Sequence, residues 1–204
     1  KDIIQNAIEN YGLNSIMLSM EYVLDNPDFG ITDYNNGTAN QQIKDSLYNV
    51  TSWIKDNYPD VTIIVKIYLK SNNADFGNTG GIPSNLTTWF NNYTNLLLSH
   101  AQLCTQYNVK YLGIDNEYNV LCSFAYHSYW QTLVNTIKAS YPNLKLFGST
   151  NLPYKYANYD IIDVIGWNFY PCLTVKQYAE VTVEDLKRNV NYDINGTLWM
   201  DIFN

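Results

Sequence analysis

The sequence has little charge, few cysteines and no long apolar segment. Charged residues make up 15% of its 204 positions, and cysteines number three. No apolar run reaches the ~20 residues that a membrane-spanning helix requires. The net charge is -7 and the 12 Lys and Arg residues are scattered, whereas a nucleic-acid backbone requires clustered basic side chains. We therefore expect no membrane span in this chain and no nucleic-acid partner.

Motifs for metals, nucleotides and hydrolytic triads are also lacking. His100 and His127 are far apart in the sequence and have no companions at metal-ligand or triad spacing. The cysteines, Cys104, Cys122 and Cys172, are too few for a metal cluster or a disulfide framework. A Gly-x-Gly-x-x-Gly pattern and a phosphate-binding loop are both missing, which weakens a dinucleotide-binding fold. We expect no cofactor.

Uncharged polar side chains supply most of the expected surface, and asparagine is frequent among them. Five Asn-X-Ser/Thr sequons begin at Asn36, Asn49, Asn85, Asn92 and Asn195. Each is a glycan acceptor in a secreted protein. A chain rich in Asn, Ser and Thr also forms sequons by chance. We predict an extracellular or cell-surface glycoprotein.

Apolar strands and amphipathic helices alternate along most of the chain. Hydrophobic residues make up 46% of it, enough for one sizeable core. Buried strands are predicted at residues 15–24, 61–69, 109–119, 144–149, 161–170 and 197–203. Helices are predicted at residues 2–11, 42–58, 86–107, 127–140 and 183–190. This alternation predicts an α/β fold with an all-parallel sheet, either covered on both faces or closed into a barrel.

The length points to an incomplete barrel. A complete (β/α)8 barrel needs about 250 residues, and this chain lacks roughly one strand at the front and one β/α unit at the back. We therefore predict a single domain over residues 1–204, resembling a TIM barrel with about six of the eight strands. Missing strands would leave open sheet edges. Self-association or flanking segments would then complete the barrel.

Polar side chains stand at the predicted carboxyl ends of the strands. Asp115, Asn116 and Glu117 end the strand that begins at Val109, and Trp199 and Asp201 lie in the last strand. In a β/α barrel these ends share one pocket. Aromatic rings stack on sugar rings, amides bind hydroxyls, and two carboxyl groups can divide the work of glycoside hydrolysis. The pattern therefore favours a carbohydrate site that contains Glu117 and Asp201.

Two motifs make the resemblance to a known family specific. The pair Asn116-Glu117 resembles the Asn-Glu that closes the fourth strand in the clan of retaining (β/α)8 glycoside hydrolases. Residues 163–171, Asp-Val-Ile-Gly-Trp-Asn-Phe-Tyr-Pro, resemble the sixth strand of that clan. The order of elements is most similar to endo-β-mannanase-like families such as glycoside hydrolase family 113. The resemblance implies a retaining double-displacement hydrolase of a β-linked polysaccharide.

Roles follow from this resemblance residue by residue. It implies that Glu117 is the acid/base, that Asn116 binds the sugar 2-hydroxyl and that Tyr170 hydrogen-bonds the nucleophile. Asn168 is expected to bind substrate, while Trp167 and Trp199 either stack on sugar or pack inside the barrel. The predicted barrel also places Cys122 and Cys172 after its fourth and sixth strands, where they could meet as a disulfide.

Asp201 departs from the family pattern, which has Glu at the nucleophile position. Its side chain is one methylene shorter, whereas retaining chemistry requires the two carboxyl groups to lie ~5 to 5.5 Å apart. A misplacement on that scale can cost ~100-fold in rate. A second hypothesis is therefore a catalytically inactive barrel that serves as a carbohydrate-binding or structural surface protein. A third, an intracellular α/β enzyme of other chemistry, lacks any supporting motif.

Overall fold

The computed structural model describes residues 1–24, 38–71, 74–75, 82–151 and 155–167. The helices are α1 (Asp2–Tyr11), α3 (Thr38–Asn57), α4 (Leu86–Gln106), the short 3-10 helix η1 (Phe124–Tyr126) and α5 (His127–Ser140). The strands are β1 (Ser15–Leu24), β2 (Thr62–Ser71), β3 (Ala74–Asp75), β4 (Tyr111–Gly113), β5 (Lys145–Thr150) and β6 (Val164–Trp167). None of the helices in these ranges is long and apolar enough to cross a membrane.

The strands form one sheet in the order β1-β2-β4-β5-β6, and each neighbouring pair in this order is parallel. The predicted parallel α/β sheet is therefore confirmed, and the layout is that of a partial (β/α)8 barrel. The sixth predicted strand, residues 197–203, and the predicted helix at 183–190 lie outside the described residues. The short strand β3, which pairs antiparallel with the end of β2, falls where the sequence predicted only a loop.

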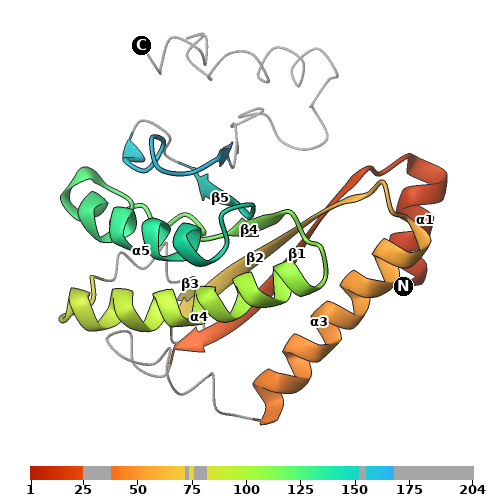
Figure 1. The fold of residues 1–204 in the computed structure, drawn as a ribbon, viewed down its shortest axis with the longest axis horizontal. Coiled ribbons are helices and arrows are strands. Elements are labelled where there is room, and N and C mark those ends of the chain that lie inside the picture. The colour runs from red at the N-terminus through yellow and green to blue at the C-terminus, as the bar shows by residue number, and fades with distance from the viewer. Residues whose placement is uncertain (25–37, 72–73, 76–81, 152–154, 168–204) are drawn as a thin grey trace, which may run out of the picture.

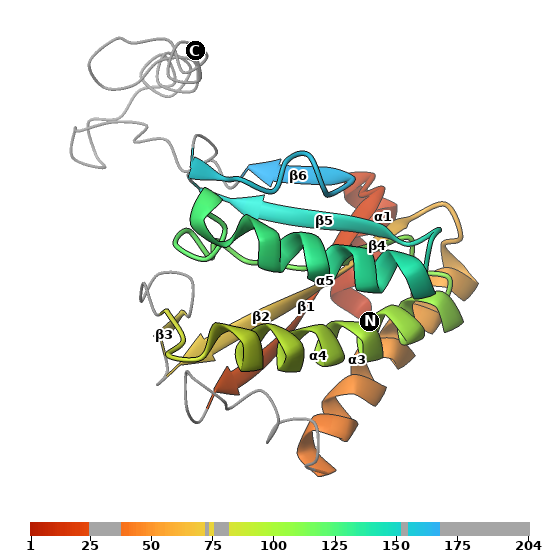
Figure 2. The same ribbon diagram turned by 60° about the vertical axis from the view of Figure 1, so that its left-hand side comes forward.

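Strand β2 explains how the layers form, because its side chains alternate between two environments. Ile63, Val65, Ile67 and Leu69 are at most 1% exposed. They belong to the core on the side covered by helices α3, α4 and α5 (Figures 1 and 2). The alternate residues, Ile64 among them, face the opposite, concave side of the sheet, because successive side chains of a strand point to opposite faces.

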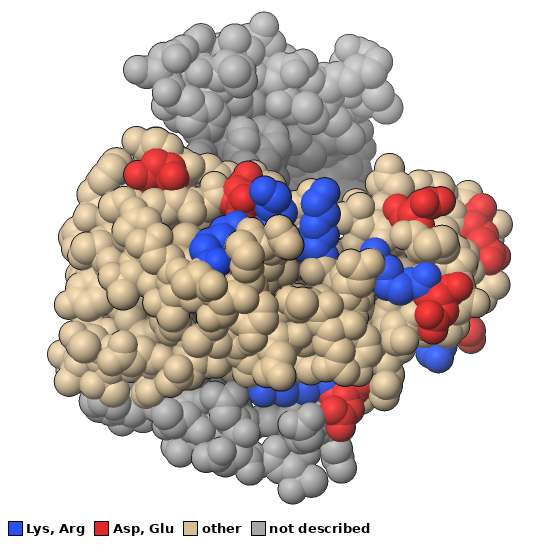
Figure 3. All heavy atoms as spheres, in the orientation of Figure 1, with Lys and Arg blue, Asp and Glu red and all other residues tan. Residues whose placement is uncertain are grey.

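Helix α4 forms much of the outer layer and carries no charged residue. Its N-cap is Asn85, whose side chain accepts a hydrogen bond from the Thr88 main-chain N–H at 3.0 Å and so favours a helix that starts at Leu86. Trp89, Phe90 and Tyr93 lie on its buried side. Charged side chains are correspondingly sparse over α4 and α5 in Figure 3. The outer surface of this part of the molecule is built mainly from amides and hydroxyls.

A buried histidine joins α4 to its neighbours. His100 is fully buried; its Nε2 lies 2.8 Å from the hydroxyl of Tyr22 in β1, and its Nδ1 lies 2.9 Å from the hydroxyl of Tyr48 in α3. Burial, with a smaller effect from Lys44, lowers the pKa of His100 to about 3. The imidazole is therefore neutral at pH 7, donating one hydrogen bond and accepting the other. The network fixes the helical layer against the first strand.

Candidate active site

The acidic segment predicted to end a strand lies at the carboxyl edge of the sheet. Strand β4 ends at Gly113, so Asp115, Asn116 and Glu117 follow it directly, next to the end of β5. All three are buried, with Asn116 and Glu117 each 7% exposed and Asp115 fully buried. This is the edge at which parallel α/β folds place their chemistry. The strand itself is shorter than predicted, because the chain leaves the sheet at these polar residues.

Glu117 adopts an unusual backbone conformation. Its φ is 55°, in the left-handed region, and the other two described residues with such angles are Gly12 and Asn108. Glycine and asparagine tolerate this region, whereas other L-residues pay about 1–2 kcal/mol for it. The Glu117 main-chain N–H donates to the carbonyl of Ser149 at 3.0 Å, which holds it at the edge of β5. Strained residues of this kind cluster at functional sites.

An asparagine at the end of β5 contacts the Glu117 carboxylate. Asn151 Nδ2 donates to Glu117 Oε2 at 3.3 Å. The Asn151 Oδ1 atom is buried and has no hydrogen-bond partner among the described residues. Nothing in the sequence alone distinguishes Asn151 from its polar neighbours Ser149 and Thr150. The contact arises from the parallel pairing of β4 with β5, which no local motif encodes.

Asp115 is the centre of a second, fully buried cluster. Its Oδ1 accepts the Ser149 main-chain N–H at 2.6 Å, and its Oδ2 accepts the Tyr156 hydroxyl, with the Cys122 thiol 3.8 Å away. Burial raises the pKa of Asp115 to about 6, and the hydrogen bonds from Tyr156 and Ser149 limit that rise. Gly148 makes room for the cluster, because a Cβ there would lie 2.0 Å from the Tyr156 hydroxyl.

Strands β1 and β2 contribute a more exposed ion pair at their own carboxyl ends. Lys70 Nζ lies 2.7 Å from Glu21 Oε2, with side chains 32% and 48% exposed respectively. The same ammonium lies 5.9 Å from the centre of the Tyr68 ring. An ion pair this exposed contributes at most about 1 kcal/mol to stability. Together with the Tyr68 ring, this ion pair forms a charged surface at the carboxyl ends of β1 and β2.

The other predicted site residues are only partly described. Trp167 is the last described residue of β6, which lies within the strand predicted at residues 161–170. Asn49 and Asn85 are exposed and Asn92 is half-buried, so their glycosylation stays a prediction. The remaining predicted residues lie outside the described part of the chain: Asn36, Asn168, Tyr170, Cys172, Asn195, Trp199 and Asp201. The distance from Glu117 to Asp201 therefore stays a prediction. The pairing of Cys122 with Cys172 also stays a prediction, and the structure describes Cys122 as a buried free thiol.

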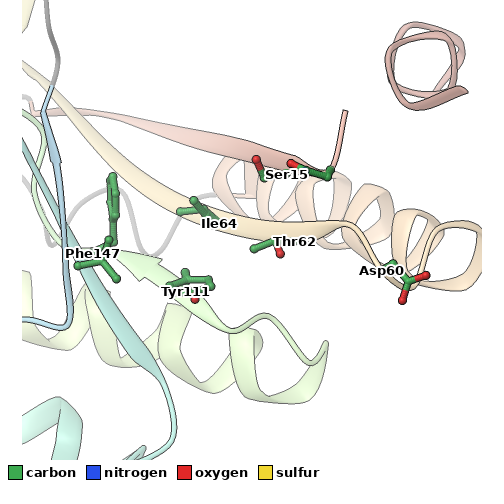
Figure 4. A pocket seen from close by; sticks show the side chains of 8 residues that line it. Ser15, Asp60, Thr62, Ile64, Tyr111 and Phe147 are labelled. Carbon is green, nitrogen blue, oxygen red and sulfur yellow. The ribbon is translucent and has the colours of Figure 1, made fainter. Parts of the chain in front are cut away.

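A separate hollow lies at the opposite end of the sheet. It has a volume of about 390 Å³ and is lined by residues near the amino ends of the strands, including Ser15, Thr62, Ile64, Tyr111 and Phe147 (Figure 4). In a closed barrel, inward residues of this kind pack against one another. Asp60 is the one carboxyl group among the described residues of its lining. The hollow therefore lies away from Asp115 and Glu117, which follow the carboxyl end of β4.

Comparisons with known proteins agree with this layout at the level of fold. No protein-family model matches the sequence. No curated protein sequence matches it either. Two solved structures of GH113 β-1,4-mannanases superpose with TM-scores of 0.68 and 0.65, each at 15% identity over 83% of this chain and 56% of the other. A GH113 β-mannanase from Alicyclobacillus acidocaldarius gives a TM-score of 0.54 at 10% identity, over 78% of this chain and 51% of the other.

This chain therefore spans just over half the length of those mannanase structures. At such low identity the match shows the fold alone. The predicted resemblance in layout to family 113 is confirmed in that sense. The chain has a partial TIM-barrel fold that places Asn116 and Glu117 at its carboxyl edge.

Proposed function

We propose that this chain is part of a glycoside hydrolase that cleaves a β-linked polysaccharide with retention of configuration. The observation that carries the proposal is Glu117, a buried carboxyl group in a strained backbone conformation at the carboxyl edge of a glycosidase-like fold. A fold preserves such strain where the side chain is needed for function. Together with the preceding Asn116, it matches the Asn-Glu pair of the glycoside hydrolase clan that the sequence resembles.

The proposed mechanism divides the work between two carboxyl groups. The Glu117 carboxylic acid protonates the glycosidic oxygen while Asp201 attacks the anomeric carbon, so that the C–O bond to the leaving group breaks and a glycosyl ester forms. The Glu117 carboxylate then removes a proton from water, which attacks the same carbon and releases Asp201. Asn116 binds the sugar 2-hydroxyl, and Tyr170 orients Asp201.

Mannan is the first substrate to test, because the three solved structures compared above are β-mannanases or β-1,4-mannanases. The expected extracellular or cell-surface location is consistent with a polymeric substrate that cannot enter cells. The aromatic and amide side chains at the predicted strand ends suit recognition of sugar rings and hydroxyls. No cofactor takes part in the proposed steps.

The direct test measures reducing sugar released from β-1,4-mannan and, for comparison, β-glucan. The unmodified protein should hydrolyse one of them, and Glu117→Gln, which keeps the shape but cannot donate or accept the proton, should lose ~100-fold or more. Glu9→Gln is the matched control, because Glu9 lies on α1 and bonds Tyr58 at 2.6 Å, far from the edge. Equal activity in all three proteins would contradict the assignment of Glu117.

The inactive-barrel alternative is favoured by one observation, the Asp at position 201 where the clan has Glu. Binding of mannan without turnover would support it. Asp201→Glu distinguishes the two, because the longer side chain brings the carboxylate forward by about one methylene. A rise in activity of ~10-fold or more would place residue 201 in the reaction.

A further inference from the structure

The end of β4 departs from regular pairing at the residues that precede Glu117. Ile114 N–H donates to the Phe147 carbonyl at 2.9 Å, as a parallel ladder requires. The next regular bonds would run from Ser149 N–H to the Ile114 carbonyl and from Asn116 N–H to the Ser149 carbonyl. Instead the Ile114 carbonyl accepts the Tyr93 hydroxyl at 2.7 Å. The Ser149 carbonyl accepts from Glu117, one residue later than expected.

The Asp115 side chain takes the place that the main chain leaves. Its carboxylate accepts the Ser149 N–H at 2.6 Å, so the peptide group that β4 no longer pairs is still satisfied. The Ser149 hydroxyl makes a longer contact of 3.4 Å with the Asp115 carbonyl. One residue of β5 thus bonds Asp115 through its N–H and Glu117 through its carbonyl. Such bulges occur near active sites because they redirect a side chain.

We propose that Asp115 is a positioning residue that holds Glu117 in its left-handed conformation by binding the main chain of Ser149. The inference rests on the proposed function, in which Glu117 is the general acid. Tyr156 strengthens the arrangement by donating to the second Asp115 oxygen, and Gly148 leaves the space in which the Tyr156 hydroxyl lies. Without the Asp115 carboxylate, the buried Ser149 N–H would lose its acceptor. In regular parallel pairing this N–H would instead donate to the Ile114 carbonyl.

Regular pairing would move Glu117 away from its present position. If Asn116 N–H bonded the Ser149 carbonyl, Glu117 would be displaced by one residue along the strand, and successive side chains of a strand point to opposite faces. The contact between Glu117 and Asn151 Nδ2 at 3.3 Å would then be lost. Asp115 therefore determines which way the proposed acid points, although its own carboxylate is fully buried.

The test compares two substrates that depend differently on a general acid. Hydrolysis of mannan requires protonation of a poor leaving group, whereas 2,4-dinitrophenyl β-mannoside has a leaving group that departs without it. Asp115→Ala should reduce kcat/KM for mannan by ~100-fold, the effect of a misplacement of about 1 Å. For the dinitrophenyl substrate the loss should stay below ~5-fold, because little proton transfer is needed. Asp115→Asn, which keeps an acceptor oxygen, should recover most of the mannan activity.

The fold itself supplies a matched control at the other end of β5. Asp163 accepts the Leu146 main-chain N–H at 2.8 Å and also bonds Lys145 at 3.0 Å. Asp163→Ala therefore removes a carboxylate that accepts a main-chain N–H of the same strand, without touching the Glu117 edge, and should lower activity on both substrates by the same factor. If Asp115→Ala fails to fold, Tyr156→Phe removes one bond to Asp115 and should produce a smaller split in the same direction.

Equal losses on the two substrates in the folded Asp115 variant would overturn the proposal. A crystal structure of Asp115→Ala separates this failure from that of the proposed function. We expect Glu117 to leave its positive φ and its bond to the Ser149 carbonyl, whether or not the unmodified protein hydrolyses mannan. An unchanged Glu117 backbone would refute the positioning role, and an inactive parent protein would refute the proposed function.

Discussion

Replacing Glu117 by Asn should relieve backbone strain while removing the proposed activity. The structure contains three described residues with left-handed backbone, and the chain places Gly at position 12, Asn at position 108 and Glu at position 117. Only the last residue type is poorly suited to that conformation. Glu117→Asn should therefore recover about 1–2 kcal/mol of backbone strain. Loss of the 3.3 Å bond from Asn151 to the charged carboxylate should cost about 1.5 kcal/mol, so the two effects nearly cancel relative to the unmodified protein.

The assay is urea unfolding followed by tryptophan fluorescence, together with thermal unfolding followed by circular dichroism. A difference of about 1 kcal/mol in the free energy of unfolding corresponds to about 2–4 °C in Tm for a chain of this length. Glu117→Gln is the control for charge, because it removes the carboxylate but keeps a side chain unsuited to a positive φ. The Asn variant should be more stable than the Gln variant by about 1 kcal/mol.

Position 108 offers the converse experiment. Asn108 is exposed, follows helix α4 and has a φ of 53°. Asn108→Glu should place the same unfavourable residue at this exposed position and lower the free energy of unfolding by about 1 kcal/mol. The reasoning would be refuted if Asn108→Glu cost nothing and Glu117→Asn proved no more stable than Glu117→Gln. In that case the backbone at Glu117 would carry no strain to explain.

Three further predictions concern the buried polar groups. The pKa of His100 is lowered from 6.5 to about 3, so its contribution to stability is present above pH 6.5 and is lost as pH falls toward 3. The urea midpoint of His100→Phe should therefore vary less with pH over that range. At pH 7 the variant should be less stable than the unmodified protein, because two tyrosine hydroxyls lose a partner. The pKa of Asp115 is raised from 3.8 to about 6, so its contribution to stability is present below pH 3.8 and is lost as pH rises through 6. Asp115→Asn removes this contribution and should make the acid-induced loss of stability between pH 6 and 4 larger, by an amount on the order of 3 kcal/mol. An unchanged dependence of stability on pH would contradict the effect of burial on the Asp115 pKa. Gly148→Ala should lower the free energy of unfolding by about 1–3 kcal/mol, because its Cβ would overlap the Tyr156 hydroxyl, and an unaltered Tm would show that the space is not used.

The element pattern was predictable because it depends on local periodicity. Helix α5 has the predicted bounds of 127–140, and β1 those of 15–24, since flanking prolines and apolar spacing indicate both. Strand β3 was missed because two residues paired to the end of β2 have no periodicity to detect. The location of Glu117 at the carboxyl edge also followed from the sequence, because it depends only on the strand being parallel.

The arrangement around Glu117 could not be predicted in the same way. Its positive φ, the contact with Asn151 and the bonds between Asp115 and Ser149 all depend on how β4 and β5 come together, more than thirty residues apart in sequence. A sequence pattern identifies Asp115 only as one more acid at a strand end. The buried network of His100 was equally hidden, because an isolated histidine in an amphipathic helix suits a surface as well as a core.

The central claim is that Glu117 is the acid/base of a retaining glycosidase, and rescue of a disabled variant tests it most directly. Glu117→Ala should be slow on 2,4-dinitrophenyl β-mannoside because it lacks the base that activates water in the second step. Added azide, which needs no base, should restore turnover and yield the β-configured mannosyl azide. Absence of rescue, or an azide of α configuration, would contradict the account.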